Sequence, residues 1–393
     1  MSLEDHYNDL EPSGDEAEEH PWRADWEGAE GTIQTGALPD DFDPHDFSAV
    51  LHRLGYSPDE VKMELVSASR WEQRTAVRDD EGRKTGEMAS TYLNAYKYKA
   101  VRNALCVPLP ALYAEVKASK PTKNAPSPTG RTAVVVFGDL QCGKVDHLGG
   151  LTEMLHRLDE KRAALKKYLK SAKVESVIIA DVGDIVEGFE NIPAQTRTNC
   201  LSLMDQVDVA ATELWKTIRV AEKFGPVDVL SVPSNHAQWR RGKSLVGKPT
   251  DDWGLHINQR LERLNEEAGL RVAFHRPPDW EETLSFEVQG ITLGMAHGHQ
   301  ANSPDRVKDW WAKMTHGGVL DCQILLTGHY HFPSLRPSGR DAKTGRTRWH
   351  IQASTLDNGS AWVRNKMGED GDPAMTVFVV DQTGFDVQSF SLL

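Results

Sequence analysis

The pattern of apolar and polar positions changes character along the chain and predicts four segments. Residues 1–41 hold acids, glycine and proline with few aliphatic side chains. Such an acidic tail cannot bury enough surface to offset its chain entropy, so we expect it to be disordered. Residues 42–110 begin with helical apolar spacing and continue as two alternating stretches around a polar turn, which predicts a small N-terminal α+β module. Residues 111–130 are rich in proline, serine and lysine and predict a linker.

From residue 131 to residue 393 the pattern alternates between apolar strands and amphipathic helices. Strand-like "AVVVFGD" is followed by the helical pattern "LTEMLHRLDEKRAALKKYLKSA". A second strand and a second helix follow in the same order, and a third strand comes after them. This βαβαβ rhythm predicts an α/β domain whose sheet carries helices on its faces. Strands predominate after Arg271, which predicts further sheet structure in the same domain.

The distribution of charge along the chain is compatible with binding to an anionic partner. The formal net charge is -13, but residues 1–46 hold 15 acids and a single base, and the rest of the chain carries +1. Residues 51–131 hold 14 Lys and Arg against 9 Asp and Glu, a net charge of +5. No apolar run reaches the roughly 20 residues of a membrane helix, and the start lacks a secretory pattern, so we expect no membrane contact and a cytoplasmic location.

Aromatic and basic residues interleave along the two hairpin arms of the N-terminal module. This pattern favours a nucleic-acid platform, in which rings stack on bases and cations contact phosphates. The alternative is a small packing domain with no such role, and the pattern does not separate the two. The residues concerned are Trp71, Tyr92, Tyr96 and Tyr98 with Arg70, Arg74, Lys97 and Lys99.

Five polar clusters share one placement, each at the C-terminal end of a predicted strand. Ligands of open α/β sheets bind outside those strand ends, so the clusters are expected to meet. Five in order are hard to explain as coincidental core and loop residues, although each alone is a weak signal. They contain Asp139 and Gln141, then Asp184, then Asn235 and His236, then His297 and His299, and finally His329 and His331.

The residue types in these clusters favour a metal centre. Carboxylates, amides and imidazoles without a thiolate suit Mn, Fe or Zn. Two ions held roughly 3.5 to 4 Å apart need a shared ligand, which a carboxylate provides easily, and Asp184 is the natural bridge.

The ordered clusters resemble the motifs of the calcineurin-like metallophosphoesterases over roughly residues 131–335. In that family the motifs are, in order, D-x-H, G-D-x-x-D, G-N-H-D/E, an isolated His and G-H-x-H. The resemblance implies a four-layer α/β/β/α sandwich with a dinuclear centre and with His236 as general acid beside Asn235. It implies that one ion is held by Asp139, Gln141, Asp184 and His331, and the other by Asp184, Asn235, His297 and His329.

The chain departs from the family pattern at several positions. Glu187 stands for the second acid of G-D-x-x-D, and Ser234 and Ala237 replace neighbours of the G-N-H motif, yet none of these is a metal ligand in the family. Gln141 is the serious departure, because an amide oxygen adds no charge. We therefore expect two divalent ions, the first held more loosely, with Mn preferred and Fe, Zn or Mg as alternatives.

The implied activity is metal-dependent hydrolysis of a phosphoester. Arg240 and Arg241 follow His236 closely and would orient a phosphate, the alternative being a solvated basic loop. Our preferred interpretation is a phosphodiesterase or nuclease acting on DNA or RNA, similar to phage-type relatives of the double-strand-break repair exonucleases. The alternatives are a phosphatase for protein or small-molecule phosphomonoesters, and a catalytically weak binding or assembly protein that retains the fold.

Overall fold

The chain, seen in a computed structural model, forms two compact units, residues 1–105 and residues 106–393. Residues 22–393 are described, apart from 28–29, 57, 59–60, 79–82, 103–108, 121–127, 190, 192–194, 242–243 and 370. None of the described helices is both long enough and apolar enough to cross a membrane. Each unit is considered by itself.

The first unit is a five-stranded sheet that packs against one short helix. Asp46 caps helix α2 (Phe47–Arg53) by accepting the N–H of Ala49, and the helix buries Val50 and Leu51 against the sheet. The strands are β1 (Arg23–Glu27), β2 (Glu30–Gln34), β3 (Leu38–Pro39), β4 (Val61–Arg78) and β5 (Lys84–Arg102). The predicted α+β character and hairpin are therefore observed.

Two expectations for this region need correction. Strands β1 to β3 lie inside the segment 1–41 that was expected to be disordered, because Ile33 and Leu38 are buried in the core beneath α2. Residues 1–21 lie outside the described residues. Tyr96 and Tyr98 are buried in the same core, so they are not available as stacking platforms.

Part of the expected linker 111–130 is also ordered. Helix α3 (Leu109–Ala118) buries Leu112 and Val116. It lies against helix α7 (Trp253–Glu267), where Arg260 donates to the hydroxyl of Tyr113. The predicted boundary at residue 110 divided this helix, and the proline, serine and lysine that follow it dominated the prediction for 111–130.

The second unit begins with the predicted βαβαβ pattern. Strands β6 (Arg131–Val136), β7 (Ser176–Asp181), β8 (Val227–Ser231) and β11 (Val272–His275) are parallel, with β17 (Thr376–Asp381) and β18 (Gly384–Leu392) antiparallel beyond β6. Helices α4 (Leu151–Ala172) and α6 (Leu203–Ala221) form where their apolar spacing predicts, and each turns a buried face inward.

A second sheet packs face to face on the first and shares its core. Its strands, in order, are β12 (Thr283–Val288), β13 (Ile291–Ala296), β14 (Ile324–Thr327), β16 (Thr347–Gln352) and β15 (Ser334–Arg340). Val134 and Ile178 of the first sheet meet Leu293 and Leu326 of the second in one apolar cluster. The shorter elements are β9 (Arg240–Arg241), β10 (Ser244–Leu245), α5 (Gln195–Thr198), α8 (Val307–His316), α9 (Ala361–Met367) and the 3-10 turns His299–Ala301 and Pro304–Arg306.

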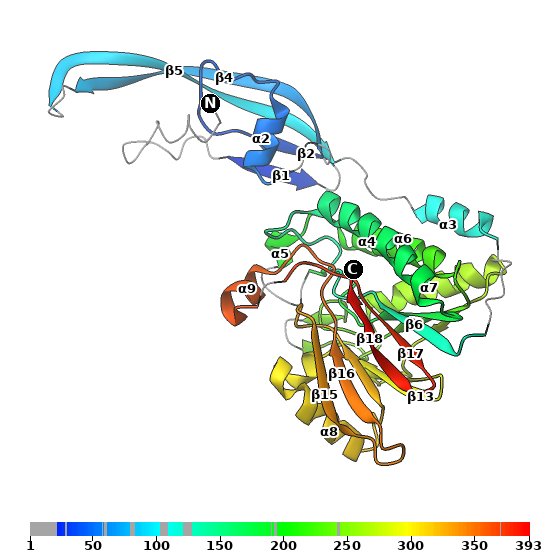
Figure 1. Cartoon of the computed structure of the whole chain (residues 1–393). Helices are drawn as coiled ribbons and strands as arrows, with labels where there is room; N and C mark the ends of the chain where they lie inside the picture. Colours follow the sequence, from blue (N-terminus) through cyan, green and yellow to red (C-terminus); the bar gives the residue numbers. More distant parts are fainter. Residues whose placement is uncertain are drawn as a thin grey trace. The chain divides into compact units, whose positions relative to one another are not determined.

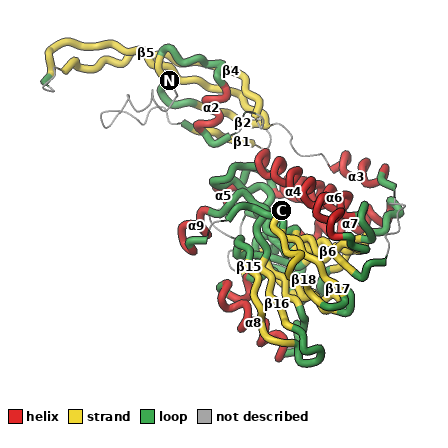
Figure 2. The backbone as a smooth tube through the Cα atoms, viewed as in Figure 1, coloured by secondary structure: helices red, strands yellow, loops and turns green. Residues whose placement is uncertain are grey.

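Helices cover both sides of the paired sheets. Figures 1 and 2 show α4, α6 and α7 on one side and α8 on the other. On the α8 side, Trp311 packs with Leu325 of β14. The predicted α/β class of this domain is confirmed, while the four-layer count stays a prediction.

The core makes a direct stability prediction. Trp215 of α6 has no exposed surface, so Trp215→Ala should destabilise the chain by about 3–5 kcal/mol through the cavity it leaves. Trp362→Ala is the matched control, because its side chain is 61% exposed and its loss should change stability by less than about 0.5 kcal/mol. Urea unfolding followed by circular dichroism measures both, and equal unfolding midpoints would contradict the assigned core.

Candidate metal centre

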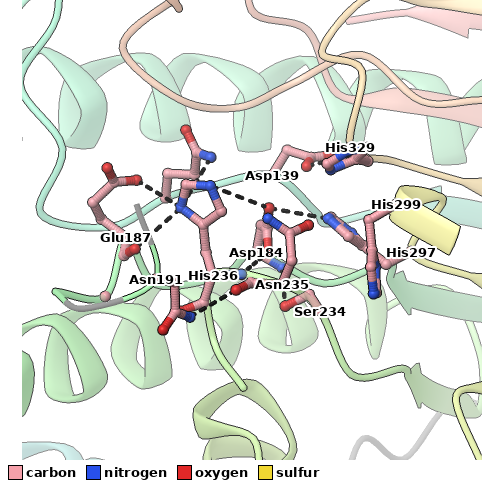
Figure 3. Close-up of polar contacts among 12 residues, drawn as sticks. Asp139, Asp184, Glu187, Asn191, Ser234, Asn235, His236, His297, His299 and His329 are labelled. Atoms are coloured by element: carbon pink, nitrogen blue, oxygen red, sulfur yellow. Dashed lines mark hydrogen bonds and ion pairs between the residues drawn. The ribbon is translucent and has the colours of Figure 1, made fainter. Parts of the chain in front are cut away.

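The clustered polar residues lie just beyond the C-terminal ends of five strands. Asp139, Asp184 and Asn235 follow β6, β7 and β8 of the first sheet, while His297 and His329 follow β13 and β14 of the second. Because the two sheets pack face to face, these strand ends bring the side chains to one place, as Figure 3 shows. The sequence prediction that the clusters converge therefore agrees with the structure.

One set of donor atoms is well suited to a divalent cation. Three residues, Asp184, His297 and His329, each offer one ligand atom, and these three atoms lie within 4.8 Å of one another. Within the described residues, Oδ1 of Asn235 is buried with no hydrogen-bond partner, while Oδ2 of Asp184 and Nε2 of His297, also buried, lie 3.0 Å apart and have no hydrogen-bond partner other than each other. Buried polar atoms in folded proteins are almost always paired, so this group of lone-pair donors fits a metal ion.

The surroundings of His297 prepare its Nε2 for that role. Its Nδ1 lies 2.8 Å from the carbonyl oxygen of Val182, so we infer that Nδ1 carries the proton and donates it there. Burial would lower the pKa of His297, but the carboxylate of Asp184, 3.0 Å from Nε2, outweighs it and raises the pKa to about 9. A divalent ion would take the place of the proton that Nε2 then holds.

His236 lies between two carboxylates, as Figure 3 shows. Its Nδ1 is 3.2 Å from Oε2 of Glu187 and 3.1 Å from the carbonyl oxygen of the same residue. Its Nε2 faces the metal ligands, 4.0 Å from Oδ2 of Asp184. Burial would lower the pKa of His236, but Asp184 and then Glu187 outweigh burial and raise it. The ring is thus held in one orientation with a protonated nitrogen toward the centre.

The atoms predicted to hold the other ion are already engaged with protein groups. Asp139 accepts the backbone N–H of His329 with both oxygens, each at 3.0 Å, and lies 3.8 Å from Nε2 of His331. Oε1 of Gln141 accepts a hydrogen bond from Nζ of Lys144 at 2.6 Å. This set fits a divalent ion less well, since one of its four predicted ligand atoms, Oε1 of Gln141, already faces a cation.

The two arginines predicted to bind phosphate differ in position. Nη2 of Arg240 lies 3.4 Å from Nε2 of His299, whose ring is 5.5 Å from that of His297, so Arg240 reaches the edge of the site. Arg241 is exposed on the short β9–β10 hairpin, and within the described residues no contact joins it to the site. Lys243, on the same loop, lies outside the described residues.

Comparison with known proteins supports the resemblance seen in the sequence. No model of a protein family matches the chain. A curated protein of Mycoplasma pneumoniae described as a "Probable metallophosphoesterase" is 27% identical over 107 residues, which are 26% of this chain and 67% of the relative. That relative, the ordered motifs and their convergence at one donor set agree. The chain is similar to the calcineurin-like metallophosphoesterases.

Solved structures that match the chain do so at low similarity. Vacuolar Protein Sorting 29 from Cryptosporidium parvum is 13% identical with a TM-score of 0.30, covering 64% of this chain and 86% of that one. Wild-type Vps29 with Zn2+ from Entamoeba histolytica is 9% identical with a TM-score of 0.30, covering 66% and 97%. A metallophosphoesterase from Sphaerobacter thermophilus is 15% identical with a TM-score of 0.27, covering 67% and 88%. With scores this low, the assignment rests on the motifs and the curated relative.

The backbone of the chain is strained at the site, and it is also closely packed there. A Cβ at Gly183 would come within 2.5 Å of Cβ of Ser234 and 2.9 Å of Nδ1 of His297. Non-glycine residues rarely adopt positive φ, and such residues gather at functional sites. Of the nine described non-glycine residues with positive φ, five belong to the predicted ligand sets: Asp139, Gln141, Asp184, His329 and His331.

Sequence reasoning missed several residues that support the site. Lys144 follows Gln141 by three positions, but a lysine so near a metal motif carries no signal of its own. Asp357, fully buried beside Lys144, belongs to no family motif. Asn191 donates to the backbone carbonyl oxygens of Asn235 and His236 at 2.6 and 2.8 Å and so fixes their loop. Only their contacts in space show these roles.

The donor set leads to a prediction about metal content. His297→Ala removes one of the clustered ligand atoms, so the affinity for a divalent ion should fall by at least the roughly 10- to 100-fold seen for residues that merely support a ligand. His316→Ala is the control, because His316 is exposed at the end of α8. Calorimetric titration with Mn2+ measures both variants. Wild-type affinity in His297→Ala would remove His297 from the ligand set.

Proposed function

We propose that the chain hydrolyses phosphodiester bonds of nucleic acid with a divalent ion held by Asp184, Asn235, His297 and His329. The observation that supports this is the cluster of ligand atoms of Asp184, His297 and His329 beside His236, together with Oδ1 of Asn235, which is unpaired among the described residues. Such an ion polarises a phosphoryl oxygen and acidifies a water molecule at neutral pH. The nuclease activity is part of this proposal, and so is the similarity to phage-type repair exonucleases. Both are more specific than the resemblance to the metallophosphoesterases.

The chain's own residues supply the proton and the orientation. Glu187 holds Nδ1 of His236, so Nε2 points toward the centre and donates its proton to the leaving alkoxide. Arg240, held on Gln238 by Nε and Nη2 at 3.0 and 2.6 Å, brings a guanidinium to the edge of the site and contacts a non-reacting phosphate oxygen.

Features of the first unit support a nucleic-acid substrate. Beyond Trp71 and Tyr92, strands β4 and β5 pair only with each other among the described residues and form a two-stranded ribbon. A ribbon of this kind fits the major groove of DNA. The guanidinium of Arg70 lies 4.4 Å from the ring centre of Tyr92, which is 45% exposed. This exposed cation and ring have the chemistry that stacks on bases and contacts phosphates.

The basic residues of strands β4 and β5 lie on two opposite faces of the sheet. Directly paired residues of antiparallel strands share a face, so Arg70 and Arg74 lie with Asn94 and Ser90, on the face of Tyr92. Lys97 and Lys99 occupy the opposite face of β5, since successive residues alternate. A flat polyanion would contact one of these pairs and not the other.

The proposed role of His236 predicts a separation of turnover from metal binding. His236→Ala should lower turnover roughly 100- to 10,000-fold, because general acid catalysis contributes that much. Its bound metal should stay near the wild-type amount, since His236 donates a proton and does not coordinate. Elemental analysis and kinetics on the same sample test this, with His316→Ala as control. Loss of metal in His236→Ala would make His236 a ligand.

The two faces of the ribbon make a second prediction. Arg70→Ala with Arg74→Ala should weaken DNA binding and reduce its salt dependence by about 0.7 to 0.9 log units per lost phosphate contact. Lys97→Ala with Lys99→Ala, on the opposite face, is the matched control. Fluorescence anisotropy at several salt concentrations measures both. If neither variant changes the salt slope, the ribbon does not bind nucleic acid and a phosphatase becomes the better interpretation.

The substrate class has its own test. Metal-depleted protein refilled with Mn2+, Zn2+, Fe2+ or Mg2+ is assayed on a phosphomonoester, a phosphodiester, and single- and double-stranded DNA. Faster cleavage of the diester and DNA supports the proposal. Preference for the monoester favours the phosphatase, and no turnover with any metal favours the binding or assembly protein.

A further inference from the structure

Lys144 lies inside the region that the family pattern gives to the first ion. Its side chain is buried, and its Nζ contacts Oε1 of Gln141 and Oδ2 of Asp357, each at 2.6 Å. The backbone is fixed as well, because Nδ2 of Asn358 donates to the carbonyl oxygen of Lys144 at 2.6 Å. The ammonium group is therefore a built part of the site.

Asp357 is fully occupied by protein donors. Its Oδ1 accepts the N–H of Gly359 at 2.8 Å, and its Oδ2 accepts from Lys144 and lies 3.2 Å from Nδ1 of His331. The carboxylate thus balances the charge of Lys144 and holds the ring of His331. This link ties a ligand of the first-ion set to the lysine.

The orientation of Gln141 follows from its two neighbours. Its Nε2 lies 3.5 Å from Nδ1 of His236, and its Oε1 faces Lys144. The reverse orientation would put the amide N–H groups against an ammonium group, which has only donors. The oxygen of Gln141 is therefore directed at the lysine.

An ion bound to Gln141 would lie close to the ammonium group of Lys144, as an upper limit on their separation shows. Metal–oxygen bonds to hard ligands are roughly 2.0 to 2.2 Å long. With Oε1 of Gln141 2.6 Å from Nζ of Lys144, an ion on that oxygen would lie at most about 4.8 Å from the ammonium group. A divalent cation and an ammonium group repel each other at this distance.

We propose that this centre binds a single divalent ion, and that the ammonium group of Lys144 takes the place of the first ion as a fixed positive charge. The ion lies in the Asp184, Asn235, His297 and His329 set, and only in this respect does the inference rest on the proposed function. Gln141 then is a hydrogen-bond partner of Lys144, which explains why a neutral amide stands where the family has histidine. Asp139 keeps a positioning role through the N–H of His329.

Metal stoichiometry of the wild type tests the inference directly. Metal-depleted protein is equilibrated with excess Mn2+, and the bound ions are counted by elemental analysis and by calorimetric titration. One ion per chain, with the electron paramagnetic resonance spectrum of an isolated Mn2+, is expected. Two ions per chain, or the spectrum of a coupled pair, would overturn the proposal.

A double variant tests the part played by Lys144. Lys144→Met with Gln141→His removes the ammonium group and restores an imidazole, so it should bind two ions per chain. Lys166→Met, on the exposed side of α4, is the control and should bind one. A double variant that still binds one ion would show that Lys144 does not exclude the other, and the wild-type count stands even if this variant fails to fold.

Hydrolysis of a phosphodiester by the same samples separates the two proposals. One ion with hydrolysis supports both. One ion without hydrolysis overturns the proposed function and leaves the single-ion centre, whereas two ions with hydrolysis overturn the single-ion centre alone.

Discussion

The buried charge of Asp184 is the constraint on which the site depends. Its Oδ1 accepts the N–H of His236 at 2.9 Å, its Oδ2 lies 3.0 Å from Nε2 of His297, and its carbonyl oxygen accepts the N–H of Gln141. Burial would raise the pKa of Asp184, but His297 and then His236 outweigh it and hold the pKa well below its ordinary value. One carboxylate thereby joins loops from both sheets.

The acids around Asp184 are balanced in different ways. Asp252, which caps α7 and accepts the N–H of Ser234 at 2.9 Å, is buried without a cation, and burial raises its pKa to about 7. Asp357 is held ionised by Lys144 and His331, which outweigh burial and lower its pKa. The protein thus places its fixed cation beside Asp357 and leaves the donor atoms near His297 without one. This asymmetry separates the two halves of the centre.

The sequence predicted the residues that follow strands and missed those that act across the fold. Asp184 and His297 could be found because the ends of apolar strands are visible in the pattern and meet at one place. Lys144 and Asp357 are 213 positions apart, and no local pattern reports such a pair. The placement of Gln141 was anticipated, but its predicted role as a ligand remains untested.

The first unit shows another limit of sequence patterns. Alternation along β5 indicates that Tyr96 and Tyr98 share a face, but it does not say that α2 covers that face. The register shift between Leu65 and Ser67 moves the later part of β4 by one position, which puts Arg70 on the face of Tyr92. The apolar spacing predicted the helix, but neither the face that it covers nor the bulge has a signature in the residues concerned.

The strained backbone is held by the same side chains that the site would use. Each residue held in a sparsely populated conformation costs on the order of 1 to 3 kcal/mol. Asp139 and Asp184 have positive φ, and their carboxylates offset part of this cost because they accept the backbone N–H groups of His329 and His236. Removing either carboxylate would therefore release a neighbouring loop as well as remove a candidate ligand.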